Sequence, residues 1–362
     1  MESPVIWLDV TLVIDWSWRL DTQKILDAFK AVSLGKLCLH PEAPLACGGG
    51  LVHAHTIRKS GDLAKIAREG HVCVPANSVG DLMKPNRPAM KLMGIAKATT
   101  FNGFCNKHDT GVFFPIEGMP LKICQEHAFL LAYRSLCREL YAKLDLVSSM
   151  PVHREINEAK RVPSQTYDRE FLNLIGEAAA IGLADLQEHK RMYDSVLTSK
   201  DYNQMNYFCI VFDKIPSVMC SGGFIPEIDF EGNALYQISD WFDLSKRMDY
   251  CSASCLALDD GGAMMFCWLG YSMPCERLIR SLRKSNWDRC PDRIINFIFE
   301  FFENIAVAPD WWDALATINA AKLIHRLQSG VDTGERSASS MLDDNSCVAT
   351  FKVVDCRTNL TN

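Results

Sequence analysis

The chain has 362 residues, of which 48% are hydrophobic and 23% charged, and its formal net charge is −6. This composition is typical of globular proteins, and the length suffices for two or three domains. The net negative charge excludes a protein that coats nucleic acid with its whole surface, but it leaves room for a local basic patch.

The first twenty residues do not have the pattern of a targeting or membrane segment. They lack a basic start, and Asp9 and Asp15 interrupt the apolar run. No other segment reaches about 18 uninterrupted apolar residues, the usual minimum for a spanning helix. We therefore expect no membrane partner and a cytoplasmic location. The alternation in VIWLDVTLVIDW (5–16) predicts a buried strand, and TQKILDAFKAV (22–32) predicts an amphipathic helix.

Cysteine is frequent in this chain, with 15 residues. The number is odd and the spacing is scattered, which is not typical of a disulfide framework. We expect most of these cysteines to be buried, reduced thiols that behave as small apolar side chains.

Residues 36–120 differ in kind from the rest, because they are rich in Gly, Pro, Cys and His. Within them SGDLAKIAREG predicts one short helix, with Ser60 as its cap and Gly70 as its stop. The run PANSVGDLMKPNRPAMKLMG (75–94) predicts a loop.

Two long helical patterns follow, over 121–204, and then the period changes to that of strands. Apolar residues recur every three or four positions in ICQEHAFLLAYRSLCRELYAKLDLV and again in SQTYDREFLNLIGEAAAIGLADLQEHKRMYDSVL. Strands are predicted in NYFCIVFDKI, SVMCSGGFI, ALYQIS, CSASCLAL and AMMFCWLGY, and helices return after them. The tail 329–362 is small and polar, so we expect it to be mostly disordered.

The predicted fold class is therefore α+β, in four segments. Residues 1–120 hold an N-terminal strand and helix and a small zinc-binding, treble-clef-like module. Residues 121–204 form a helical connector, 205–328 an α+β domain, and 329–362 the tail.

Four residues of the first segment form a complete ligand set for structural zinc. Cys105 and His108 make a C-x2-H pair after Gly103, and Cys38 and Cys47 make a wider pair. Structural zinc takes four such ligands in a tetrahedron, often as two short pairs far apart in the sequence. We predict a Cys3His site, with His53 or His55 in place of Cys38 as the alternative.

This segment resembles part of a known group of proteins. AHTIRKS…LAKIAREGHV…TFNGFCNKHDTGVFFPIE is similar to the N-terminal segment of largely uncharacterised bacterial proteins in which an HTI histidine and an FCxxHD turn occur together. More distantly, residues 36–118 are similar to HNH endonucleases of the treble-clef type. The resemblance implies a zinc-containing protein that binds DNA or RNA and cleaves it, as in bacterial defence. His55 would be the general base, Mg²⁺ or Mn²⁺ would bind the phosphodiester, and His53 or His71 would be auxiliary.

The charge pattern favours a nucleic-acid partner. Between His55 and Asp109 nine basic residues face four acidic ones, a local excess of five positive charges in an acidic protein. The basic residues are Arg58, Lys59, Lys65, Arg68, Lys84, Arg87, Lys91, Lys97 and Lys107.

A function of another class also fits the sequence. The zinc would then be purely structural, and the protein would be a non-catalytic interaction or ligand-sensing protein that recognises a protein partner or a small ligand through its C-terminal domain.

Overall fold

The computed structural model describes residues 37–76, 89–159, 165–237, 239–240, 243, 246–329 and 338–360. The strand and helix expected at 5–16 and 22–32 lie outside these residues.

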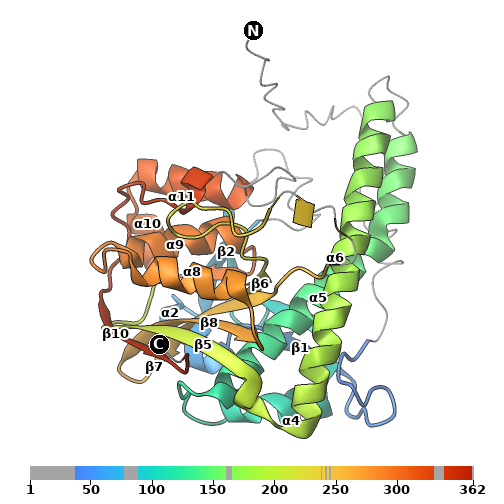
Figure 1. Ribbon diagram of the computed structural model, residues 1–362, viewed down its shortest axis with the longest axis horizontal. Coiled ribbons are helices and arrows are strands. Elements are labelled where there is room, and N and C mark those ends of the chain that lie inside the picture. Colours follow the sequence, from blue (N-terminus) through green and yellow to red (C-terminus); the bar gives the residue numbers. More distant parts are fainter. Residues whose placement is uncertain are drawn as a thin grey trace.

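An eight-stranded sheet forms the centre of the molecule (Figure 1), in the order β10-β5-β8-β7-β6-β9-β2-β3. Neighbouring strands are antiparallel throughout. The strands are β2 (His71–Pro75), β3 (Met90–Gly94), β5 (Met205–Phe212), β6 (Val218–Phe224), β7 (Cys251–Leu258), β8 (Gly261–Leu269), β9 (Ile305–Val307) and β10 (Val353–Thr358).

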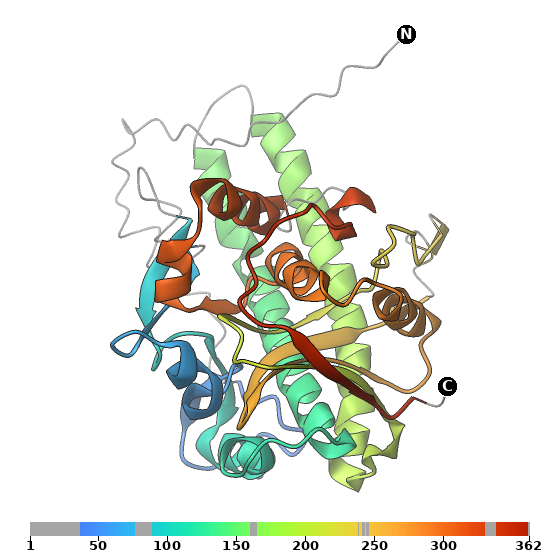
Figure 2. The same ribbon diagram turned by 90° about the vertical axis from the view of Figure 1, so that its left-hand side faces the viewer.

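Helices cover both faces of this sheet (Figure 2). The pair α5 (Gln125–Ala159) and α6 (Gln165–Ser199) lies along one face, and α8 (Met273–Arg283) and α9 (Cys290–Phe301) lie on the other. The short α10 (Pro309–Ala314) and α11 (Thr317–Ser329) follow, and the turns η2 (Tyr202–Gln204) and η3 (Ala338–Met341) complete this part. No helix in the described ranges is long and apolar enough to cross a membrane.

Burial on both faces explains the continuous apolar runs of the central strands. Along β8, Met264 and Phe266 enter the core under α8 and α9, while Met265 and Cys267 enter the core under α5 and α6. Successive side chains of a strand point to opposite faces, so both sets must be apolar when both faces are covered.

The fold is α+β, as predicted, but the sheet crosses the expected segment boundaries at 120 and 204. Strands β2 and β3 come from within the first segment, and β2 pairs with β9 at Cys73↔Val307. β3 lies in the run expected to be a loop, and β10 lies in the tail expected to be mostly disordered. The sequence ALYQIS, expected to be a strand, contributes only an isolated bridge between Ile228 and Ala234 among the described residues.

A second, two-stranded sheet carries the candidate site. It consists of β1 (Leu51–His55) and β4 (Thr100–Cys105), and the helix α4 (Asn106–Glu117) starts directly after β4. After β1 the chain forms a π-helical turn, η1 (Lys59–Leu63), and the single turn α2 (Ala64–Ile66). Together they are shorter than the helix expected over SGDLAKIAREG.

A buried ion pair fastens η1 to the large sheet. Arg58 and Asp62 are 5% and 0% exposed, and the guanidinium donates to the Asp62 carboxylate from Nε at 2.8 Å. Arg58 Nη2 also donates to the Ala257 carbonyl at 2.8 Å, and the Ala257 amide donates to Asp62 Oδ1 at 2.7 Å. The pair thus satisfies both backbone groups of one residue of β7, as a neighbouring strand would.

Because His189 of α6 is buried, we expect the stability of the protein to depend on pH. Its Nε2 donates to the Met248 carbonyl at 2.8 Å, and burial lowers its pKa to about 4. As the pH falls, the histidine of the unfolded chain, with a pKa near 6.5, takes up a proton before the buried His189 does. Protonation therefore favours the unfolded state, and the protein loses stability progressively from about pH 6.5 down to about pH 4. Between pH 7 and pH 5 we expect a loss of about 2 kcal/mol from this group.

Urea unfolding of the wild type and of His189→Gln at the two pH values measures this loss. Glutamine keeps a donor for Met248 but does not titrate, so the variant should lose about 2 kcal/mol less than the wild type between pH 7 and pH 5. Equal pH dependence of the two proteins would contradict the assignment.

Candidate metal centre

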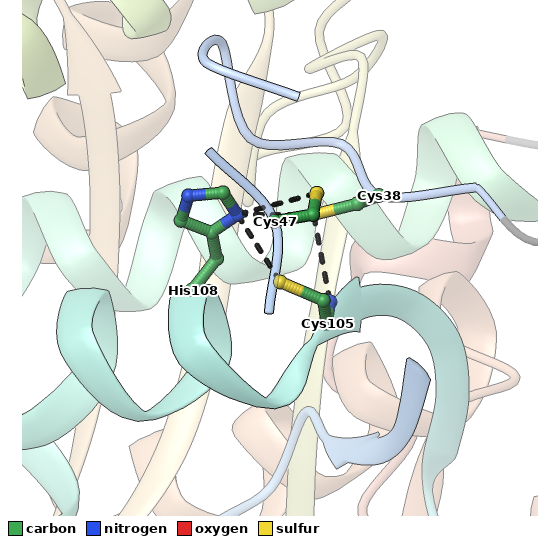
Figure 3. Close-up of side chains that lie close together, drawn as sticks. All are labelled: Cys38, Cys47, Cys105 and His108. Atoms are coloured by element: carbon green, nitrogen blue, oxygen red, sulfur yellow. Dashed lines mark hydrogen bonds between the residues drawn. The ribbon is translucent and has the colours of Figure 1, made fainter. Parts of the chain in front are cut away.

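Four side chains from separate parts of the chain meet at the start of α4 (Figure 3). Cys38 and Cys47 come from the loop before β1, Cys105 ends β4 and caps α4, and His108 lies in the first turn of α4. Their ligand atoms all lie within 4.8 Å of one another. The cluster could hold a metal ion such as zinc.

The distances within the cluster suit a tetrahedral ion. His108 Nδ1 lies 3.4 Å from Cys38 Sγ, 3.8 Å from Cys47 Sγ and 3.3 Å from Cys105 Sγ. Zinc bonds of about 2.3 Å to sulfur and about 2.0 Å to nitrogen place such atoms about 3.5 Å apart in a tetrahedron. The four donors are therefore spaced for this geometry.

Backbone amides surround the sulfurs. The Cys105 amide donates to Cys38 Sγ at 3.4 Å, and the Gly48 amide donates to Cys105 Sγ at 3.5 Å. Gly49 and Gly50 have φ values of 77° and 74°, a left-handed conformation that glycine adopts without strain. These glycines let the chain turn from Cys47 into β1.

The surroundings of the cluster shift the pKa values of its members in different directions. Burial alone would raise the pKa of Cys105, but hydrogen bonds from the backbone amides of Gly48 and His108 and from the other two thiols lower it below its usual value. Desolvation of the sulfur and hydrogen bonds with Cys38 and Cys105 raise the pKa of Cys47 to about 11. Burial lowers the pKa of His108, followed by the charge of Lys107. The shifts at Cys105 and His108 favour the thiolate and the neutral imidazole, which are the forms that bind metal, whereas the shift at Cys47 favours its thiol.

His40 covers the site without joining it. Its ring stacks on that of His108, with centroids 3.8 Å apart and planes at 8°. His40, Glu42 and His108 also bring ligand atoms within 4.8 Å of one another. The ring lone pairs of stacked imidazoles lie in parallel planes, however, so they cannot both point at one ion between them. We assign His40 to packing.

His55 lies apart from the metal cluster, at the end of β1. The structure brings Cys38, and neither His53 nor His55, to the cluster. His55 is half-buried, and its Nε2 lies 2.8 Å from the Ile95 carbonyl. A carbonyl only accepts, so Nε2 carries the proton and Nδ1 is left as an acceptor. Burial lowers the pKa of His55, so the ring is neutral at pH 7.

His53 and His71, the two histidines predicted to be auxiliary, have exposed side chains. The register of β1 and β4 shifts between Val52 and Ala54, and His53 lies at this shift with its side chain exposed. His71 Nδ1 lies 2.8 Å from the Glu69 carbonyl, which holds it at the start of β2.

Asp109 is a residue of this site that our sequence analysis did not single out. It follows His108 in α4, and its Oδ1 is buried without a hydrogen-bond partner. Burial raises the pKa of Asp109, and the positive charge of Arg134 opposes this shift. Unpartnered buried polar atoms in native proteins commonly mark a catalytic role or a bound water or ion. The sequence signal that could have identified Asp109 is its position directly after the candidate ligand His108, in FCNKHD.

Comparison with known proteins adds no assignment, because no family model, curated protein or solved structure matches the chain.

Proposed function

We propose that the protein is a zinc-stabilised nucleic-acid-binding protein that cleaves a phosphodiester in the manner of HNH endonucleases, with His55 as general base. The observation that carries this proposal is the state of His55. The ring is neutral and oriented by the Ile95 carbonyl, so Nδ1 is the nitrogen that takes a proton from the attacking water.

The hairpin and helix around His55 support the proposal. β1 and β4 pair in antiparallel fashion and lead directly into α4, whose first turn holds Cys105 and His108. Zinc at the four-residue cluster would fix the start of α4 against the loop before β1. It would thereby hold the strand that carries His55.

Asp109 is our candidate for holding the catalytic Mg²⁺ or Mn²⁺. No group of three or more ligands includes Asp109 or His55 in the part of the chain that the structure describes. Mg²⁺ does not need three protein ligands, because it commonly binds to one or two carboxylates together with substrate phosphates and water. The unpartnered Oδ1 supplies such a carboxylate oxygen.

The basic surface for nucleic acid is smaller than the sequence count suggests. Arg58 is buried with Asp62, and Arg68 pairs with Asp310 and Asp313 at 2.9 and 2.8 Å. Among the residues that the structure describes, the lysines that remain exposed around the hairpin are Lys59, Lys65, Lys97 and Lys107. These ammonium groups are the ones we expect to contact phosphates.

A plasmid-nicking assay with Mg²⁺ or Mn²⁺ tests the proposal. His55→Ala should reduce the cleavage rate about 10²- to 10⁴-fold, the usual contribution of a general base, with unchanged zinc content and thermal stability. His53→Ala, two residues earlier on the same strand, is the matched control and should retain activity. Unchanged cutting by a folded His55→Ala protein would exclude His55 as the base.

A non-catalytic interaction or ligand-sensing role is the second candidate, favoured by how firmly the first segment is built into the sheet. Arg58 and Asp62 bind the backbone of β7, and β2 pairs with β9. A wild-type protein that contains zinc but cuts neither DNA nor RNA would support this role, and pull-down with residues 205–362 intact would then identify the partner.

A further inference from the structure

A polar cavity lies between α5 and the end of α9, away from the metal cluster, and has a volume of about 300 Å³. This volume is at the lower end of the range for ligand sites. At about 30 Å³ for each water-sized group, the cavity holds a molecule of about ten non-hydrogen atoms. Five charged side chains line it, namely Arg138, Glu139, Lys143, Glu300 and Glu303.

Buried hydrogen bonds fix the walls of this cavity. Asn304, in the turn after α9, is 8% exposed, and its Nδ2 donates to Thr56 Oγ1 at 2.7 Å and to the Ser221 carbonyl at 2.6 Å. The hydroxyls of Ser135 and Ser221 lie 2.8 Å apart, which joins α5 to β6. The cavity is therefore preformed, and a ligand binds without the entropic cost of ordering its walls.

The charges of the lining do not cancel. Three carboxylates face two cations, which gives the lining a formal charge of −1. Arg138 Nη1 donates to Glu139 Oε1 at 2.9 Å. Burial lowers the pKa of Arg138, but the charges of Glu139 and Glu303 raise it and prevail. One guanidinium thus serves two of the three carboxylates.

The third carboxylate, Glu300, is paired in the same way. It is 5% exposed, and Arg326 Nη1 lies 3.3 Å from its Oε2. Arg326 Nη2 also donates to Asp344 Oδ2 at 3.1 Å. Both guanidinium groups are therefore shared between two carboxylates, and the negative charge remains in excess.

An excess of carboxylates in a partly enclosed site favours a positively charged ligand. The walls exclude water, and the lower local dielectric strengthens the attraction between unlike charges. A carboxylate has about four lone-pair positions, so the hydrogen bond from Arg138 leaves Glu139 able to accept from a second donor. Glu303 is the exposed one of the three carboxylates, and an entering cation meets it first.

We propose that this cavity is a binding site for a small polar organic cation, whose ammonium or guanidinium group pairs with the carboxylates of Glu139 and Glu303. The proposal is independent of nucleic-acid cleavage. It gives the junction of α5 and α9 a small-molecule ligand.

Ligand-observed NMR and calorimetry with three probes of similar length test the charge requirement. 5-Amino-1-pentanol carries a cationic head, 5-hydroxypentanoate carries an anionic one, and 1,5-pentanediol is neutral. The amine should bind with a Kd below about 10 mM. The diol and the hydroxy acid should each bind at least tenfold more weakly, because neither pairs with the excess carboxylates.

Variants locate the bound amine. Glu303→Gln should weaken its binding about three- to fivefold, the usual contribution of an exposed ion pair, and Ala142→Phe should abolish it by filling the cavity. Lys143→Met removes a positive charge from the lining and should bind the amine at least as tightly as the wild type. Glu126→Gln, which removes an exposed carboxylate at the start of the same helix, is the matched control and should leave binding unchanged.

Thermal unfolding checks that each variant is folded. Absence of amine binding by the wild type, equal binding of the diol or the hydroxy acid, or weaker amine binding by Lys143→Met would each overturn the proposal. So would full binding by folded Glu303→Gln or Ala142→Phe, or a loss in Glu126→Gln equal to that in Glu303→Gln.

Discussion

Cys105→Ser is expected to abolish stoichiometric zinc binding and to lower the stability of the protein. The wild type should carry about one zinc per chain, because the four donors form one tetrahedral set. Metal that binds only the folded state stabilises it by about 4 kcal/mol when its free concentration is 1,000 times Kd. Loss of the Cys105 ligand removes this stabilisation, together with the contact between the loop before β1 and the start of α4.

Elemental analysis of the purified proteins and urea unfolding with and without EDTA measure the two effects. Cys356→Ser is the matched control, because Cys356 is also a free cysteine but lies exposed on β10. EDTA should destabilise the wild type and the control but leave Cys105→Ser unaffected. A wild-type protein without zinc, or a Cys105→Ser protein with full zinc and stability, would show that the cluster is not a zinc site.

The meeting of these four side chains could be predicted because the chemistry of zinc restricts the choice of candidate ligands. Few residue types bind zinc, and the C-x2-H pair of Cys105 and His108 stands in a tight turn after Gly103. The pair Cys38 and Cys47 carries a weaker sequence signal, because eight residues separate them and zinc-binding pairs usually have two to four between them. The sequence also allowed His53 or His55 in place of Cys38, and only the folded chain shows that Cys38 lies in the cluster while the His55 ring lies against the Ile95 carbonyl.

The extent of the sheet could not be predicted, because its outer strands depend on long-range partners. β9 has three residues, and β2 has five that include a terminal proline. Such short runs carry almost no periodicity of their own. They become strands because β6 offers an edge to β9, which in turn offers one to β2. β10 likewise depends on the edge of β5, more than 140 positions earlier.

The α5 and α6 helices illustrate the opposite case. Their apolar residues recur at helical spacing over many turns, so the sequence identifies both helices, although α5 continues through Pro151 to Ala159, beyond the pattern that predicts it. What the pattern does not contain is their place against the sheet, where Leu131 and Tyr193 share one core with Cys209 of β5. These two helices therefore share a core with one face of the large sheet.

Arg58 and Asp62 show that a large effect on stability can also lie outside the candidate site. In the sequence RKSGD they have the spacing of an ordinary surface pair, four residues apart on one turn. In the structure both are buried, and Asp62 accepts from Arg58 and from the Ala257 amide at once. Asp62→Ala would therefore leave a buried guanidinium without its counter-charge, which typically costs about 3–5 kcal/mol.

Urea unfolding of a double-mutant cycle measures this coupling. Asp62→Ala and Arg58→Met should each destabilise strongly, and the double variant should lose less than the sum of the two, because neither charge is then left alone. Asp310→Ala removes an exposed ion pair between Arg68 of the first segment and α10, and it should change stability little. If Asp62→Ala were as mild as Asp310→Ala, the buried pair would not be what fastens η1 to β7. The pairing of β2 with β9 would then have to hold the first segment by itself.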